Sequence, residues 1–199
     1  IETPEGLEIG LRKNLSLMAK ISTRATMEDE EIIKEFEKSG LNKAEGETDI
    51  LFNGVFIGGI NDYANFILDI KEKRRKQKIP RELGINYNKD LNIIMISSDT
   101  GRVLRPLIIA DKGVPRINKE GVSELKNSKI SWGDLISQEL IEYIDASEED
   151  NALIAMKEED LTSEHNYLEI DALASLGPIT SLVSFGNHDQ SSRLIRGSK

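Results

Sequence analysis

The chain has 199 residues, with a hydrophobic fraction of 38%, a charged fraction of 31%, a formal net charge of −9 and no cysteine. This composition fits domains with apolar cores rather than a disordered chain, and it excludes disulfides and thiolate metal sites. The net charge argues against a protein that binds nucleic acid over its whole surface, and no apolar run approaches the roughly 20 residues of a membrane span.

Two helices are predicted in the first part of the chain. In residues 1–20, leucine and methionine recur at helical spacing and predict a short helix. Residues 26–40 predict a surface helix with Thr26 as its N-cap, acidic residues at the positive end of the helix dipole and Gly40 at its end. Its predicted buried edge consists of Ile32, Ile33 and Phe36.

A β-hairpin and a second helix are predicted next. Two apolar runs flank Asn53-Gly54, a pair that tolerates the positive φ angles of a type I′ turn. Residues 61–80 predict a helix that is capped by Asn61 or Asp62 and closed by Pro80.

The end of this helix is strongly basic, from Lys71 to Arg81. The run could be a nucleic-acid patch, but cations also gather at a helix C-terminus because the dipole favours them there. The basic face has no aromatic side chains to stack on bases. We therefore favour the explanation from the helix dipole.

The remaining elements alternate irregularly. Residues 90–99 and 103–111 predict two strands joined by a turn, and Pro106 must then lie at an edge or bulge. Residues 131–145 predict a helix capped by Ser131, and two short strands are predicted on either side of an acidic loop, at 152–156 and 167–170. Hairpins and helices without regular alternation predict an α+β fold.

Acidic residues are concentrated between 142 and 171, where Lys157 is the one lysine or arginine. Runs of this kind are usually solvated. We therefore expect this stretch to form outer surface, turned away from any nucleic acid. Its acidic members are Glu142, Asp145, Glu148, Glu149, Asp150, Glu158, Glu159, Asp160, Glu164, Glu169 and Asp171.

The sequence contains no self-contained catalytic set. There is no phosphate-binding GxxxxGK[ST] loop and no GxSxG nucleophile elbow. His165 and His188 are far apart and lack partners at metal-ligand spacing. Taken alone, the residues do not predict an enzyme.

Several stretches, in order, resemble the second-largest (β-like) subunit of multisubunit DNA-directed RNA polymerase in its archaeal and eukaryotic form. They are "IETPEGLEIGLRKNLSLMA" at 1–19, "LFNGVFIG" at 51–58, "SDTGRVLRPLI" at 98–108 and "IEYIDASEEDNALIAM" at 141–156, followed by "EHNYLEID" and "FGNHDQSSR". The resemblance implies a central fragment of a longer subunit. It implies four regions: the end of the fork at 1–22, a first outer domain at 23–112, a second at 113–180, and the start of the hybrid-binding region at 181–199.

The resemblance also implies the residues that meet nucleic acid. Arg193 matches an arginine expected to reach the phosphates of the incoming nucleotide, and Gln190 matches a polar contact to the RNA. Glu2 matches a glutamate that supports the fork. A guanidinium suits the first role because it offers permanently charged donors to phosphate oxygens. The segment departs from the family motif at Ser192, where a proline is usual, and at Asp189, which adds a negative charge beside Arg193.

From the resemblance we expect a nucleotidyltransferase of which this chain, when isolated, is an inactive part. Expected partners are the largest subunit and other polymerase subunits, the DNA template, the RNA–DNA hybrid and nucleoside triphosphates. No cofactor is expected on this segment, because the largest subunit holds the magnesium ions. Since the chain begins without a signal-peptide pattern, we expect a cytoplasmic location, or a nuclear one in a eukaryote.

Two other functions stay open. The segment could be an interaction module that docks other polymerase subunits or transcription factors. It could also be a free-standing nucleic-acid-binding protein, although the acidic stretch predicts weak binding. Arg102 and Arg105 are predicted to be structural, holding the outer domain to its neighbours through carboxylates.

Overall fold

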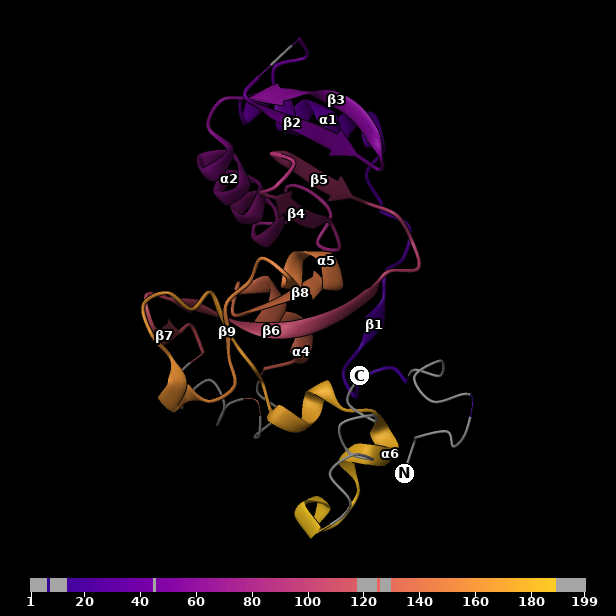
Figure 1. Cartoon of the computed structure of the whole chain (residues 1–199), viewed down its shortest axis with the longest axis vertical. Helices are drawn as coiled ribbons and strands as arrows, with labels where there is room; N and C mark the ends of the chain where they lie inside the picture. The colour runs from indigo at the N-terminus through magenta and orange to yellow at the C-terminus, as the bar shows by residue number, and fades with distance from the viewer. Residues whose placement is uncertain (1–6, 8–13, 45, 118–124, 126–129, 189–199) are drawn as a thin grey trace.

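Two units stack on one another in the computed structural model, which describes residues 7, 14–44, 46–117, 125 and 130–188 (Figure 1). The upper unit of Figure 1 contains helices α1 and α2 and strands β2 to β5. The lower unit contains strand β1 and the elements from β6 onward. Helices and strands are mixed without regular alternation, so the predicted α+β class is confirmed.

A β-hairpin begins the sheet of the upper unit. Strands β2 (Thr48–Phe52) and β3 (Val55–Ile60) pair antiparallel around Asn53 and Gly54. Both turn residues have positive φ, 48° and 80°, as a type I′ turn requires. The predicted hairpin is therefore confirmed.

The upper sheet has the order β3-β2-β5-β4. β5 (Ile93–Ser97) lies parallel to β2, and β4 (Gly84–Asn88), which the sequence pattern did not reveal, lies antiparallel to β5. Because side chains alternate between the faces of a strand, Ile50 and Phe52 point to the same side of the sheet.

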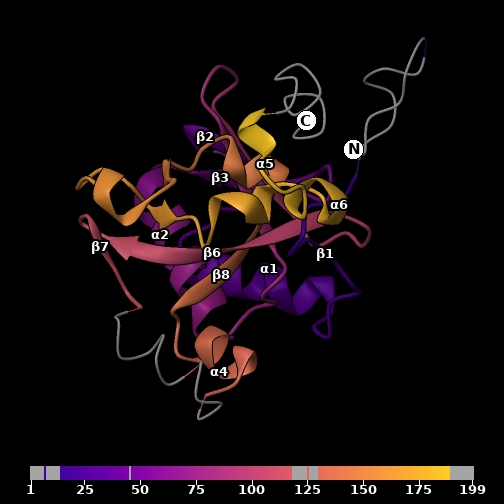
Figure 2. The ribbon, with the colours of Figure 1, turned by 90° about the horizontal axis from the view of Figure 1, so that it is seen from below.

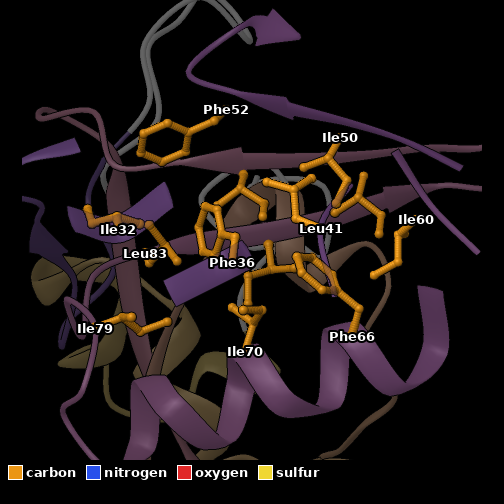
Figure 3. Close-up of a cluster of buried hydrophobic side chains, with 13 residues drawn as sticks. Ile32, Phe36, Leu41, Ile50, Phe52, Ile60, Phe66, Ile70, Ile79 and Leu83 are labelled. Carbon is orange, nitrogen blue, oxygen red and sulfur yellow. The ribbon is translucent and has the colours of Figure 1, made fainter. Parts of the chain in front are cut away.

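Helices α1 (Asp29–Lys38) and α2 (Tyr63–Arg75) cover that face and close the main hydrophobic core (Figure 3). The Phe36 ring of α1 meets Phe52 and Phe66 edge-on, with ring centroids 5.7 and 6.1 Å apart. Each such side chain contributes about 1.5–3 kcal/mol when it is fully removed from water. This core fixes the position of α2, whose last turn carries the arginines described below.

Some helix ends follow the predictions and others do not. The predicted close of α2 at Pro80 is wrong, because the helix ends at Arg75. Asp62, one of the two predicted caps of α2, accepts a hydrogen bond from the backbone of Asn65. Gly40 adopts a φ of +107° just beyond α1. Thr26 is not the cap of α1, because the helix begins after Glu28, whose side chain makes no capping bond.

Strand β6 (Val103–Asp111) organises the lower unit and crosses it in Figure 2. One side of β6 pairs antiparallel with β8 (Ile141–Asp145). The other side pairs with β1 (Lys20–Ile21) and then with β10 (Tyr167–Leu168), which lies parallel to β9 (Ile154–Ala155). A further short strand, β7, follows β6 as Val114–Pro115.

Pro106 lies inside this strand, opposite Tyr143 of β8. On its other side, β1 pairs at residues 103–104 and β10 at residues 108–109. The proline therefore stands where β6 has a strand on only one side, which suits a residue without an N–H group. β6 as a whole is internal, so the predicted edge position holds only locally.

One helix prediction is wrong, and another fails over the part of its range that the structure describes. The helix expected over 131–145 ends early: α4 (Trp132–Ser137) keeps the predicted Ser131 cap, as a capping box with Asp134, and is followed by strand β8. The chain turns at Glu139, whose φ is +59°, because β8 pairs with β6 and buries its isoleucines. The described residues 14–19 also contain no helix.

The rest of the lower unit is short elements. α5 (Ala146–Glu149) follows β8, and α6 (Pro178–Ser181) lies near the end of the described chain. Three 3-10 turns, η2 (Glu158–Asp160), η3 (Ala172–Ser175) and η4 (Gly186–His188), complete it. The predicted short strands at 152–156 and 167–170 are confirmed as β9 and β10.

The lower sheet takes strands from three of the predicted regions: β1 from 1–22, β6 from 23–112 and β8 to β10 from 113–180. The region boundaries themselves stay a prediction. Among the described residues, no helix combines the length and the apolarity that crossing a bilayer requires.

Candidate functional site

The upper and lower units meet at a cluster of buried and half-buried ion pairs, which we call the charged junction. Its cations come from the last turns of α2 and from the region of β6, and its carboxylates come from β8, α5 and the segment after β10. The junction consists of Lys71, Arg74, Arg75, Arg102, Arg105, Glu142, Asp145, Glu148, Glu149 and Glu169.

Arg74 is the centre of the junction and is only 1% exposed. Its Nε donates to Glu142 Oε1 at 2.8 Å, while Nη1 and Nη2 donate to the two oxygens of Glu148 at 2.6 and 2.8 Å. Nη1 also donates to the carbonyl oxygen of Leu83. A planar guanidinium with several fixed donors can satisfy two carboxylates at once, which a lysine could not do in this geometry.

Glu142 receives donors from three sides. In addition to Arg74, Arg75 donates to its Oε2 through Nε at 3.0 Å and Nη2 at 2.9 Å, and the Tyr167 hydroxyl donates at 3.0 Å. Burial by itself would raise the pKa of Glu142, but the charges of Arg74 and Arg75 outweigh burial and lower its pKa from 4.5 to about 2. Burial, followed by the charge of Glu142, raises the pKa of Tyr167 well above its ordinary value, so the hydroxyl remains a donor.

Glu148 connects the junction to α5 and to β4. It forms a further ion pair with Lys71 at 3.1 Å and accepts a long hydrogen bond of 3.4 Å from the backbone N–H of Ile85. Its own backbone N–H is held by the side chain of Asp145, which caps α5 at 2.9 Å. The same short helix therefore positions one carboxylate and uses another as its cap.

Arg102 brings β4 against β8. Its Nη1 lies 2.5 Å from Asp145 Oδ2, and it also donates to the carbonyl of Glu82. Gly84 passes so close to this pair that a Cβ atom there would overlap Asp145 Oδ2 and Arg102 Nη1. Glycine is thus required at this position by close approach rather than by its backbone angles.

Arg105 completes the junction on β6. It is held by both oxygens of Glu149, at 3.0 and 2.6 Å, and by Glu169. The prediction that Arg102 and Arg105 are structural and act through carboxylates is confirmed.

The junction corrects two predictions about charge. Arg74 and Arg75 are not simply cations favoured by a helix dipole, since both hold buried carboxylates. The prediction of a solvated outer surface is also wrong for four of the acidic residues, which are buried: Glu142, Asp145, Glu148 and Glu169. Other members of the acidic stretch are exposed, and they are Asp150, Glu158, Glu159, Asp160, Glu164 and Asp171.

The arrangement is suited to holding parts together rather than to catalysis. Within the described ranges, no buried side-chain nitrogen or oxygen lacks a hydrogen-bond partner, and no group of three or more His, Cys, Asp or Glu residues could hold a metal ion. His165 bonds locally to Thr162, and His188 meets the ring of Phe185 edge-on at 6.0 Å. A residue with a free lone pair and an aligned base, as nucleophilic catalysis needs, does not occur in the junction.

The residues predicted to meet nucleic acid stay a prediction. Arg193, Gln190 and Glu2 all lie outside the described residues, as do Asp189 and Ser192. The junction itself was missed from the sequence. One feature of the sequence could have indicated it: a basic run and an acidic run lie about 70 residues apart in a chain with few aromatic residues.

Comparison with known proteins gives consistent matches along the chain. Family profiles described as RNA polymerase Rpb2, domain 3, domain 4 and domain 5 match residues 1–21, 50–111 and 132–176, in that order. The chain is 36% identical to the DNA-directed RNA polymerase subunit Rpo2 of Sulfolobus acidocaldarius, over 96% of the chain and 19% of that protein. It is 35% identical to the DNA-directed RNA polymerase III subunit RPC2 of Schizosaccharomyces pombe, over 96% of the chain and 17% of that protein. The chain thus spans about a fifth of the length of these relatives.

Proposed function

This chain belongs to the Rpb2 family of RNA polymerase subunits, and on that premise we propose that it forms part of a DNA-directed RNA polymerase and serves DNA-templated RNA synthesis. The observation that carries the proposal is the order of the matches, because three successive Rpb2 domains align with three successive parts of this chain. The charged junction supports it. A part in which every buried side-chain nitrogen and oxygen of the described residues is paired suits a rigid component of a larger nucleotidyltransferase better than a separate catalyst.

Within that enzyme, we assign the contact with nucleic acid to the segment that follows the described residues. Arg193 would donate to phosphate oxygens of the incoming nucleotide, Gln190 would contact the RNA near its growing end, and Glu2 would support the fork. In phosphoryl transfer, charge develops on phosphate oxygens, and a fixed guanidinium stabilises that charge. The support for this assignment is the resemblance of "NHDQSSR" to the family's cleft motif.

The proposal includes the partners and the location of the whole enzyme. The partners are the largest subunit and other polymerase subunits, the DNA template, the RNA–DNA hybrid and nucleoside triphosphates. The magnesium ions would be held by the largest subunit. The location would be cytoplasmic in an archaeal cell and nuclear in a eukaryotic one.

A measurement on the assembled enzyme tests the proposal. Arg193→Ala should slow nucleotide addition at least tenfold while the subunits still assemble, because one charge-assisted contact to the transferring phosphates is lost. Lys34→Ala is the matched control, since Lys34 is an exposed cation of α1. Addition rates measured across nucleotide concentrations should be unchanged in the control.

The alternative is an interaction module that docks other subunits or factors. It is favoured by exposed apolar side chains near α6, among them Leu182 and Phe185, which are 82% and 78% exposed. On this alternative, Arg193→Ala leaves the rate of nucleotide addition unchanged and weakens assembly instead. That outcome would remove the proposed phosphate contact.

A further inference from the structure

A pocket of about 390 Å³ lies in the upper unit, and none of its lining residues is an ion-pair member of the charged junction. One wall is the segment 23–27, which leads into α1, and the other is the segment 77–83, which follows α2. The apolar side chains of Ile79 and Leu83, drawn at one end of the core in Figure 3, contribute to its lining together with Met27 and Pro80. The volume is within the range of small ligand sites and could hold a leucine-sized or phenylalanine-sized side chain.

Part of the backbone beside the pocket has no hydrogen-bond partner among the described residues. Residues 22–25 belong to no helix or strand, and Ser22 and Thr23 use their N–H groups on Arg102 and Glu82. The next two residues, Arg24 and Ala25, make no backbone hydrogen bond to any described residue. A stretch of main chain with open donors and acceptors is the feature that an added peptide strand uses.

The polar groups of the pocket are cationic on balance. Arg24 is exposed and has no ion pair within the described ranges, and Arg81 donates only to the hydroxyl of Ser137, at 3.2 Å. Glu82, the carboxylate in the lining, already accepts from Lys20 and from the Thr23 backbone, so its charge is compensated. In a chain of net charge −9, two arginines that pair with no carboxylate among the described residues point to a partner that supplies one.

We propose that this pocket binds an extended acidic segment of a partner protein. A carboxylate of the segment pairs with Arg24 and Arg81, an apolar side chain packs on the half-buried Met27 and Pro80, and its main chain bonds to residues 24–25. A nucleotide fits less well, because no aromatic side chain that could stack on a base lines the pocket. The inference does not rest on the polymerase role.

The test uses the full 199-residue chain and a fluorescein-labelled, C-amidated peptide of sequence Asp-Leu-Asp-Leu-Asp. Fluorescence anisotropy should show saturable binding that weakens at least tenfold in Arg24→Glu and in Arg81→Glu. Lys89→Glu, a reversal of an exposed charge outside the pocket, should leave the affinity within twofold. Thermal unfolding of all three variants establishes that they are folded.

Changes in the peptide distinguish the contribution of its charge to binding from that of its apolar side chains, without altering the protein. Peptides with Asn in place of Asp, or with Ser in place of Leu, should each bind at least tenfold more weakly. The proposal is overturned if no peptide binds, or if the Arg24→Glu and Arg81→Glu variants bind the peptide as tightly as the original chain does. It is also overturned if the serine peptide binds as tightly as the leucine peptide and inorganic phosphate displaces it. The last outcome would identify a site for small anions. None of these outcomes bears on Arg193, so this proposal and the polymerase proposal can fail separately.

Discussion

The upper and lower units bury different kinds of side chain. The upper core is a continuous cluster of isoleucine, leucine and phenylalanine from both helices and the sheet. The described cluster of the lower unit is much smaller, consisting of Leu107, Ile109, Ile144 and Tyr167. Next to it lie the buried carboxylates of the charged junction, whose partners on α2 belong to the upper unit.

Because of this difference, the stability of the two units should depend differently on pH. Burial of apolar surface depends little on pH, whereas a buried carboxylate paired with arginine contributes only while it is ionised. A buried ion pair is also costly to break, since the remaining partner is left charged and without water. The stability of the lower unit should therefore depend on the arginines of α2 and on pH, whereas the stability of the upper core should depend little on pH.

The largest expected effect comes from removing the central cation. Arg74→Met keeps the length of the side chain but removes the donors to Glu142 and Glu148, and we expect it to lower the free energy of unfolding by about 3–5 kcal/mol. Chemical denaturation measures this loss. Lys34→Met, at an exposed position of α1, should stay within about 0.5 kcal/mol of the original chain. An Arg74→Met variant as stable as this control would show that the junction does not hold the units together.

The second-largest effect is expected from acid, which should disrupt the lower unit at a higher pH than the upper unit. The pKa of Glu142 is about 2 in the folded chain and near 4.5 when unfolded, so its contribution is complete above pH 4.5 and is lost as the pH falls toward 2. The difference corresponds to about 3 kcal/mol. Trp132 is the single tryptophan and donates to the hydroxyl of Tyr143 in the lower unit. Its fluorescence should change at a higher pH than the far-ultraviolet circular dichroism of α1 and α2; simultaneous transitions would contradict the comparison.

The smallest effect concerns the upper core. Ile94→Val removes one buried methylene and should lower the free energy of unfolding by about 1 kcal/mol. Because no charge is involved, the loss should be the same at pH 7 and at pH 4. Denaturation at both values checks this, and a loss that grew with acidity would mean that the two cores are not independent.

Local signals in the sequence were sufficient for much of the upper unit. Asn53-Gly54 predicted the hairpin, Asp62 was one of two predicted caps, and Phe36 was predicted on the buried edge of its helix. Each of these depends on residues close in the chain, through turn angles, caps and helical periodicity. Prediction failed where a distant partner decided, as in residues 141–145, which pair with β6 instead of extending α4.

The candidate site shows the same division. Arg102 and Arg105 were predicted to be structural, but the burial of Glu142 and Glu148 was not predicted. A run of acidic residues is usually solvated, and only its partners in the fold show that some of its members are buried. Arg74 and Glu148 are 74 residues apart in the chain. The roles of Arg193, Gln190 and Glu2 rest on resemblance alone and stay predictions.

By itself, the sequence determined the class of fold, the hairpin, two of the helix caps and the family, since these depend on local geometry and on the order of motifs. Only the tertiary structure decided which charges are buried. The sign and spacing of charges along a chain do not show how deeply each charged group is buried. Burial determines whether a carboxylate is a solvated surface group or the partner of a buried arginine.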